Sequence, residues 1–140
     1  MATRRTNIVN AYVEKLKTIS DLGGFNVFRE FKYLDDINDF PTITLLPRVE
    51  QRLTIGAGRK LARLDISIRG YVQSEDTSLE LAEALGANVE SATTEFASEQ
   101  QANGVADARV VSFRTDEGLF DPYGVADQDV QILYDVEANL

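Results

Sequence analysis

The sequence contains no histidine and no cysteine. Without histidine there is no usual general base near neutral pH, no Ser-His or Cys-His nucleophile pair, and no imidazole ligand for zinc or iron. Without cysteine, disulfide bonds and thiolate metal sites are excluded. Carboxylates alone would have to carry any chemistry, so we expect a protein that is not an enzyme and that binds neither a cofactor nor a metal.

Long hydrophobic runs are missing as well. No segment approaches the roughly 20 apolar residues needed to span a bilayer. Arg4 and Arg5 near the start are not followed by an apolar run, so the N-terminus is not typical of a signal peptide. We expect a protein that is made in a cytoplasm and has no membrane partner.

Basic residues are scarce in the second half of the chain. The net charge is −9, with 12 basic and 8 acidic residues in 1–74 but 2 basic and 15 acidic residues in 75–140. This balance argues against a general nucleic-acid binder. It suits like subunits that meet head to tail through surfaces of opposite sign. The alternative is an acidic, solvated surface with chance clustering.

The order of apolar patterns predicts one α+β domain over residues 1–140. Leu64, Ile66, Ile68 and Val72 recur with the two-residue period of a half-buried strand at 64–73. Short connections favour a small, mainly antiparallel sheet with two helices packed on one face. We expect the helices at 6–20 and from 77 to 96–99, and the other strands at 25–31, 42–46, 109–114 and 129–136.

The ends and buried faces of the helices can also be predicted. Thr6 is a candidate N-cap for the first helix, and Thr77 and Glu80 have the spacing of a capping box for the second. Gly86 is tolerable in a helix if it allows close packing on the sheet. The expected buried stripe of the second helix is Leu81, Leu85, Val89, Ala92 and Phe96.

The segment of about 48–63 is rich in basic residues and has Gly56-Ala57-Gly58 near its middle. Pro47, just before it, fits an edge strand or a point where a strand leaves the sheet. We interpret 48–63 as a β-hairpin arm that protrudes from the core and becomes ordered against a neighbour. The alternative is a mobile, solvated loop. The basic residues are Arg48, Arg52, Arg59, Lys60 and Arg63.

An acidic connection at 116–127 has the most unusual composition. Asp116, Glu117 and Asp121 are close enough to hold Mg²⁺ or Ca²⁺, but they lack the spacing of an EF-hand, and a solvated turn explains them equally simply. Large side chains interrupt this polar loop and either pack on the core or dock into a partner: Leu119, Phe120 and Tyr123.

A second acidic group precedes the 42–46 strand. Asp35, Asp36 and Asp39 could form a carboxylate pair, but no nucleophile, oxyanion donor or phosphate-binding loop accompanies them.

Taken together, the chain resembles the tail terminator (tail completion) proteins of long-tailed bacteriophages. The resemblance covers nearly the whole length and depends on the order and size of the elements. It is carried by the N-terminal helix, Phe40-Pro41-Thr42-Ile43-Thr44, the strand at 64–72, the helix from Thr77, and the run 115–126 that leads into Val130-Gln131-Ile132-Leu133-Tyr134.

This resemblance implies a non-enzymatic virion protein of the tail or neck, made in the host cytoplasm. Six copies would form a ring that caps the tail tube, ends its polymerisation and offers the surface to which the head joins. The implied partners are the tail tube protein, the head–tail connector protein and, in a contractile tail, the sheath protein. Genomic DNA would pass through the ring without sequence reading. The alternatives are another neck or connector protein and, from a different class, a metal-dependent hydrolase.

The expected contact residues combine the basic arm and the acidic loop. For contacts between subunits or with the tube we expect Arg48, Arg52, Arg59, Lys60, Arg63, Asp116, Glu117, Leu119, Phe120 and Tyr123.

Overall fold

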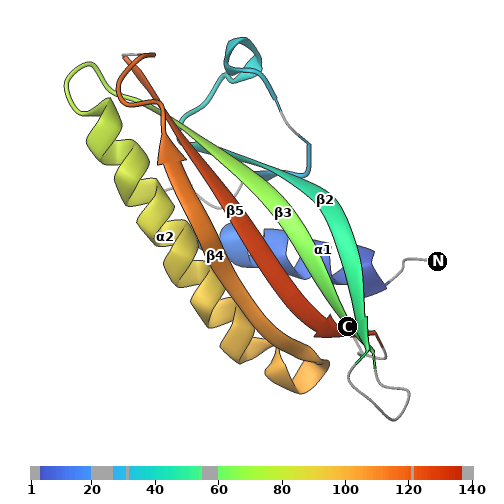
Figure 1. Cartoon of the computed structure of the whole chain (residues 1–140). Helices are drawn as coiled ribbons and strands as arrows, with labels where there is room; N and C mark the ends of the chain where they lie inside the picture. The colour runs from blue at the N-terminus through green and yellow to red at the C-terminus, as the bar shows by residue number, and fades with distance from the viewer. Residues whose placement is uncertain (1–3, 20–26, 31, 55–59, 121, 137–140) are drawn as a thin grey trace.

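The computed structural model describes residues 4–19, 27–30, 32–54, 60–120 and 122–136. In these residues one sheet of five strands, in the order β1-β2-β3-β5-β4, is combined with two α-helices (Figure 1). Within the described part of the chain, no helix is long and apolar enough to cross a membrane. The elements are α1 (Arg4–Leu16), β1 (Val27–Phe28), the 3-10 helix η2 (Leu34–Asp36), β2 (Thr42–Thr54), β3 (Lys60–Gln73), α2 (Ser78–Glu99), the 3-10 helix η3 (Gln101–Asn103), β4 (Val105–Thr115) and β5 (Tyr123–Asp135).

Strand β3 lies at the centre of the sheet, as its two-residue period predicts. It pairs antiparallel with β2 on one side and with β5 on the other. Ala62, Leu64, Ile66 and Ile68 are buried on the face that packs against the helices. The intervening residues lie on the opposite face, which the helices leave open (Figure 1). The predicted α+β class and mainly antiparallel sheet are confirmed, with β1–β2 as the parallel pair.

Both helices cover the same face of the sheet. Helix α1 buries Ile8, Tyr12 and Leu16, as its spacing predicts. The Tyr12 hydroxyl lies 2.7 Å from Thr93 Oγ1 of α2, and its ring meets Phe96 edge-on with centroids 5.2 Å apart. These buried contacts therefore join the two helices into one layer over the sheet.

The helix starts differ from the predictions. Helix α1 begins at Arg4, so Thr6 lies inside it and is not an N-cap, and it ends at Leu16 rather than Ser20, which lies outside the described residues. The capping box of α2 is wrong: Thr77 makes no side-chain cap bond, and its N–H donates instead to Ser74 Oγ at 3.1 Å. A local turn at 74–77 thus provides the hydrogen-bond acceptor for the Thr77 N–H before the helix begins.

One residue of the predicted stripe of α2 is not buried. Leu81 is 41 % exposed, whereas Leu85, Val89, Ala92 and Phe96 are buried as expected. Leu81 lies at a hollow that is also lined by Phe40 and Val72, beyond the closed part of the core.

Strand lengths also differ. The strand predicted at 25–31 is described only as Val27–Phe28; Phe25, Asn26 and Phe31 lie outside the described residues. β2 does not end at Leu46 but continues through Pro47 to Thr54, with a bulge between Pro47 and Val49. Pro47 is tolerated because, among the described residues, β1 pairs with Ile43 and Thr44 but not with Pro47, which leaves this part of β2 at an edge, as predicted.

The protruding arm at 48–63 is not confirmed. β2 and β3 pair from Thr42↔Tyr71 as far as Thr54↔Lys60, and residues 61–63 of β3 also pair with β5. Ala62 is fully buried. The bulge after Pro47 shifts the alternation of β2 by one residue, which hides the apolar pattern of a continuous strand. The expected turn around Gly56-Ala57-Gly58 lies outside the described residues.

Strands β4 and β5 are longer than predicted, so the acidic connection is shorter. Tyr123–Asp127 belongs to β5, and its Gly124 lies where an added Cβ would be 2.5 Å from the Ser78 carbonyl oxygen. What remains between the strands is the turn at 116–122, of which Asp121 lies outside the described residues.

Candidate functional site

The turn after β4 is held in one conformation by a single carboxylate. Asp116 Oδ2 accepts the N–H of Phe120 at 3.0 Å, and Asp116 Oδ1 accepts the N–H of Val125 at 3.1 Å. Glu117 and Gly118 both have positive φ, at 56° and 83°. The carboxylate that the sequence suggested as a metal ligand therefore fastens its own loop, an Asx-type arrangement typical of turns. We name residues 116–120 the acidic turn.

The acidic turn presents large apolar side chains to solvent. Leu119 is 82 % exposed and Phe120 is 53 % exposed. Contiguous exposure of this kind, rimmed by carboxylates, is typical of protein–protein contact surfaces. Tyr123, by contrast, belongs to β5, where its ring lies 5.5 Å from that of Phe40 and its N–H donates to the Phe120 carbonyl at 2.8 Å.

Two other connections lie at the same end of the sheet as the acidic turn (Figure 1). Ile37 and Leu34 pack with Tyr71 and Val125, and the N–H of Ser74 donates to the Pro122 carbonyl at 2.8 Å. The connections 34–40, 74–77 and 116–120 contain no lysine or arginine. Their exposed carboxylates, besides that of the acidic turn, are Asp35, Asp36, Asp39, Glu75 and Asp76. We name these three connections the acidic end.

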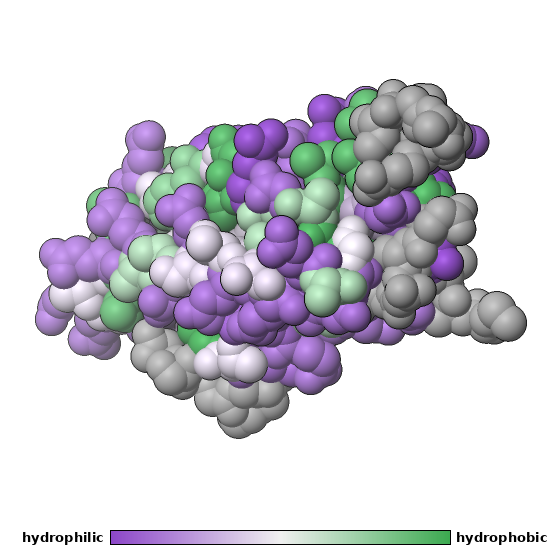
Figure 2. Space-filling view, turned by 90° about the horizontal axis from the view of Figure 1, so that it is seen from below, coloured by the Kyte–Doolittle hydropathy of each residue, from purple (hydrophilic) through white to green (hydrophobic). Residues whose placement is uncertain are grey.

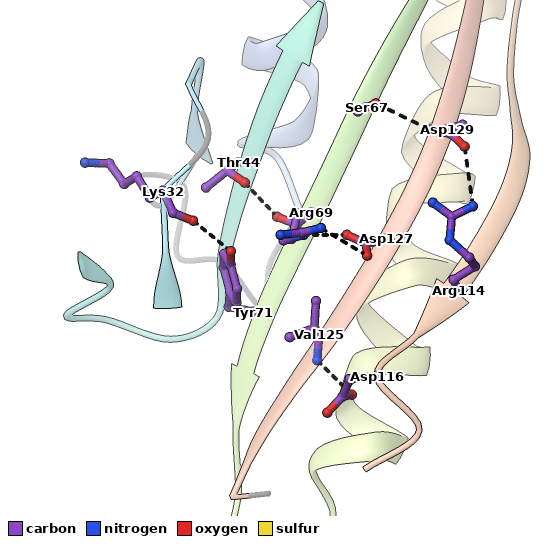
Figure 3. Close-up of polar contacts among 10 residues, drawn as sticks. All are labelled: Lys32, Thr44, Ser67, Arg69, Tyr71, Arg114, Asp116, Val125, Asp127 and Asp129. Carbon is purple, nitrogen blue, oxygen red and sulfur yellow. Dashed lines mark hydrogen bonds and ion pairs between the residues drawn. The ribbon is translucent and has the colours of Figure 1, made fainter. Parts of the chain in front are cut away.

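A row of polar contacts runs across the open face of the sheet from the acidic end (Figure 3). Arg69 Nε donates to Asp127 Oδ1 at 2.6 Å, and this bond raises the pKa of Arg69 above its ordinary value. Asp129 accepts from Ser112 at 2.7 Å and lies 3.7 Å from Arg114. Each cation here already has an anionic neighbour, so this face is electrically balanced and fixed rather than a free charged patch.

A cluster of basic residues lies at the opposite end of the sheet. A hollow between the first turn of α1 and the ends of β2 and β5 is lined by Arg4, Arg5, Glu50, Arg52, Tyr134 and Val136. We name it the arginine hollow. Glu50, whose side chain is 9 % exposed, accepts from the Tyr134 hydroxyl and lies 3.0 Å from Arg52. Burial, the bond to Glu50 and its charge raise the pKa of Tyr134.

Of the residues that line the arginine hollow, three are arginines and one, Glu50, is a carboxylate. Arg4 and Arg5 lie in the first turn of α1, where the helix macrodipole is itself positive. Lys60 lies at the neighbouring end of β3 and is exposed. Figure 2, which views the molecule from this end, shows a mainly hydrophilic surface with small hydrophobic areas between.

The structure spreads the predicted basic residues over two places. Arg52 lines the arginine hollow, and Lys60 lies beside it. Arg48 lies midway along β2, and Arg63 lies on the open face, where it donates to Gln51 Oε1 at 2.8 Å. Arg59 lies outside the described residues.

From the sequence, Arg4 and Arg5 at the unfavourable end of a helix dipole are expected to be held by a partner or to be mobile. The sequence does not single out Glu50, Tyr134 or the exposed Tyr33. Glu50 and Tyr134 could not be paired because 84 positions separate them. Tyr33, 81 % exposed, adds an aromatic side chain to the acidic end.

The carboxylates proposed for chemistry do not converge. Among the described residues, no group of three or more acidic side chains could hold a metal ion. Asp35 and Asp36 are exposed in η2, and Asp39 is exposed in the connection that follows it. Asp121, the third member of the suggested metal set, lies outside the described residues.

Comparison with known proteins places this architecture in a family. A search of curated proteins gave no match. A chain from a solved structure entitled "Virion of native gene transfer agent (GTA) particle" is similar, with a TM-score of 0.59 and 12 % identity over 90 % of this chain and 92 % of that chain. The family model described as "Bacteriophage Tail Tube Terminator Protein" matches residues 2–140. The chain therefore belongs to the bacteriophage tail tube terminator family and is a structural protein of a phage-type virion tail.

Proposed function

We propose that the protein acts as a ring of copies, six by the family resemblance, that caps the tail tube. Binding of the ring to the last layer of tube subunits ends polymerisation and creates the surface to which the head joins. The observation that carries the proposal is the family match over residues 2–140. The acidic end and the arginine hollow, which differ in charge, support it, because a closed ring needs different surfaces of one subunit to complement each other.

The role is non-enzymatic. Asp116, the best candidate for chemistry in the sequence, already accepts two backbone N–H groups with its two oxygens. The partners are further copies of the chain, the tail tube protein, the head–tail connector protein and, in a contractile tail, the sheath protein. A net charge of −9 keeps DNA from adhering as it passes through the ring.

The test uses tube subunits that polymerise in solution. Adding the purified chain is expected to stop tube growth, with a cap of one ring at the tube end in electron micrographs. Tubes that grow to the same length distribution with and without the chain would overturn the proposal, and so would binding to isolated connector complexes but not to tubes. Calorimetry with Mg²⁺, Mn²⁺ and Ca²⁺ is expected to show no stoichiometric heat.

A further inference from the structure

The sheet edges are poorly suited to joining copies. Beyond Thr44 the outer edge of β2 carries Pro47 and a bulge, and β4, the other edge strand, is interrupted by two register shifts in its pairing with β5. Such features are how natural sheets prevent edge-to-edge pairing. The contact between copies is therefore made by side-chain surfaces rather than by extension of the sheet.

The acidic turn is a preformed projection. Asp116 fixes the backbone of the turn through Phe120 and Val125, so little conformational entropy is lost when Leu119 and Glu117 enter a contact. Its tip offers one apolar and one anionic side chain, both exposed.

The arginine hollow is concave and has complementary chemistry. Arg5 and Arg52 offer positive charge, and the partly exposed Val136 offers apolar surface. Glu50 is already engaged by Arg52 and by the Tyr134 hydroxyl. The side chains of Arg52 and Tyr134 are therefore held in place before any partner arrives.

The two surfaces cannot neutralise each other within one copy. Strand β3, which runs between the two ends, has 14 residues, and at about 3.3 Å per residue it separates them by roughly 45 Å. Charges so far apart are screened, because the Debye length at physiological salt is about 8 Å. Opposite charges so far apart on one molecule attract each other effectively only when they belong to different copies, as complementary surfaces of an interface do.

We propose that the acidic turn of one copy docks into the arginine hollow of the next, which makes a head-to-tail contact between copies. This inference depends on the proposed ring and names the surfaces that would close it. Glu117 lies against Arg5 and Arg52 of the neighbour, and Leu119 covers Val136.

The experiment exchanges the charges of the two surfaces. Arg5→Glu and Glu117→Lys are each made, and association is measured by mass photometry and light scattering at low salt. Arg5→Glu places an anion at the start of α1, which the helix dipole favours, and Glu117 has no hydrogen bond from its side chain among the described residues, so both variants keep their fold. Each variant alone is expected to associate at least about tenfold more weakly than wild type.

The decisive measurement uses an equimolar mixture of Arg5→Glu and Glu117→Lys. One variant then has acidic side chains at both positions 5 and 117, and the other has basic side chains at both, so alternating copies bring opposite charges together at every junction and assembly returns. The matched controls, Glu90→Lys and Arg109→Glu, change the charge equally at a site between the ends, where both residues line one shallow hollow of α2 and β4. They are expected to leave association unchanged, alone and mixed.

Several outcomes would overturn the inference. These are single variants that associate like wild type, a mixture that stays dissociated, controls that weaken association equally, and a wild-type chain that stays monomeric at every concentration. None of them bears on tube capping, which is read from tube length with the wild-type chain, so the two proposals fail separately.

Discussion

At the scale of single residues, two buried tyrosines place hydroxyl groups inside the protein. The Tyr12 hydroxyl bonds to Thr93 in the helix layer, and the Tyr134 hydroxyl donates to Glu50 at the arginine hollow. Burial raises the pKa of both above the ordinary value of 10.0. A phenol whose folded pKa is raised stabilises the fold fully below pH 10, and this stability is lost as the pH rises above that value.

This dependence of stability on pH gives a prediction for Tyr12→Phe. At pH 7 the variant is expected to lose about 1 kcal/mol of unfolding free energy, because one hydrogen bond disappears. Above pH 10 the loss of stability with pH is expected to be shallower than in wild type, although Tyr134 and Lys15, whose pKa Glu95 and Glu99 raise, still contribute with the same sign. Urea unfolding at pH 7, 9, 10 and 11 measures both effects. Parallel curves for the two proteins above pH 10 would contradict it.

At the scale of elements, the order of helices and strands could be predicted because each has a clear period. β3 shows this best, since the burial of Leu64, Ile66 and Ile68 follows from alternation alone. β2 could not be traced past Leu46, because a bulge that shifts the alternation leaves no sign in a single sequence. The capping box failed for a related reason, as Ser74 competes for the same N–H of the turn.

The joint between α2 and β5 yields an element-scale prediction. An added Cβ at Gly124 would lie 2.5 Å from the Ser78 carbonyl oxygen and 2.7 Å from Val72 Cγ2, so the start of α2 must move away from the sheet. Gly124→Ala is expected to cost about 1–3 kcal/mol of unfolding free energy, in the range of overpacked cores.

Gly118→Ala is the informative comparison for that joint. Nothing lies within 4 Å of its Cβ position, and the cost comes only from its φ of +83°, about 1–2 kcal/mol for an L residue in the left-handed region. Thermal unfolding of both variants separates contact from backbone strain. A Gly124→Ala protein as stable as wild type would show that the start of α2 packs more loosely on β5 than the structure indicates.

At the scale of the whole molecule, the uneven charge of the sequence becomes a difference in charge between the acidic end and the arginine hollow. The chain halves predicted opposite signs, but the fold redistributes them: Asp35, Asp36 and Asp39 from the basic half lie at the acidic end. The arginine hollow likewise combines the first turn of α1 with the ends of β2 and β5. Such sites could not be predicted from the sequence, because they are made by segments that are far apart in the chain.

Salt gives the prediction that belongs to this scale. If copies join through the acidic turn and the arginine hollow, the dissociation constant of wild-type assemblies should rise between about 0.05 and 1 M NaCl, as the Debye length falls to about 3 Å. Arg5→Glu, already weak at low salt, should change much less, because the attraction to be screened is gone, and Glu90→Lys should follow wild type. Sedimentation velocity over the salt series measures all three. Wild-type association that strengthens with salt would assign the contact to apolar surface instead, since salting-out favours burial of such surface.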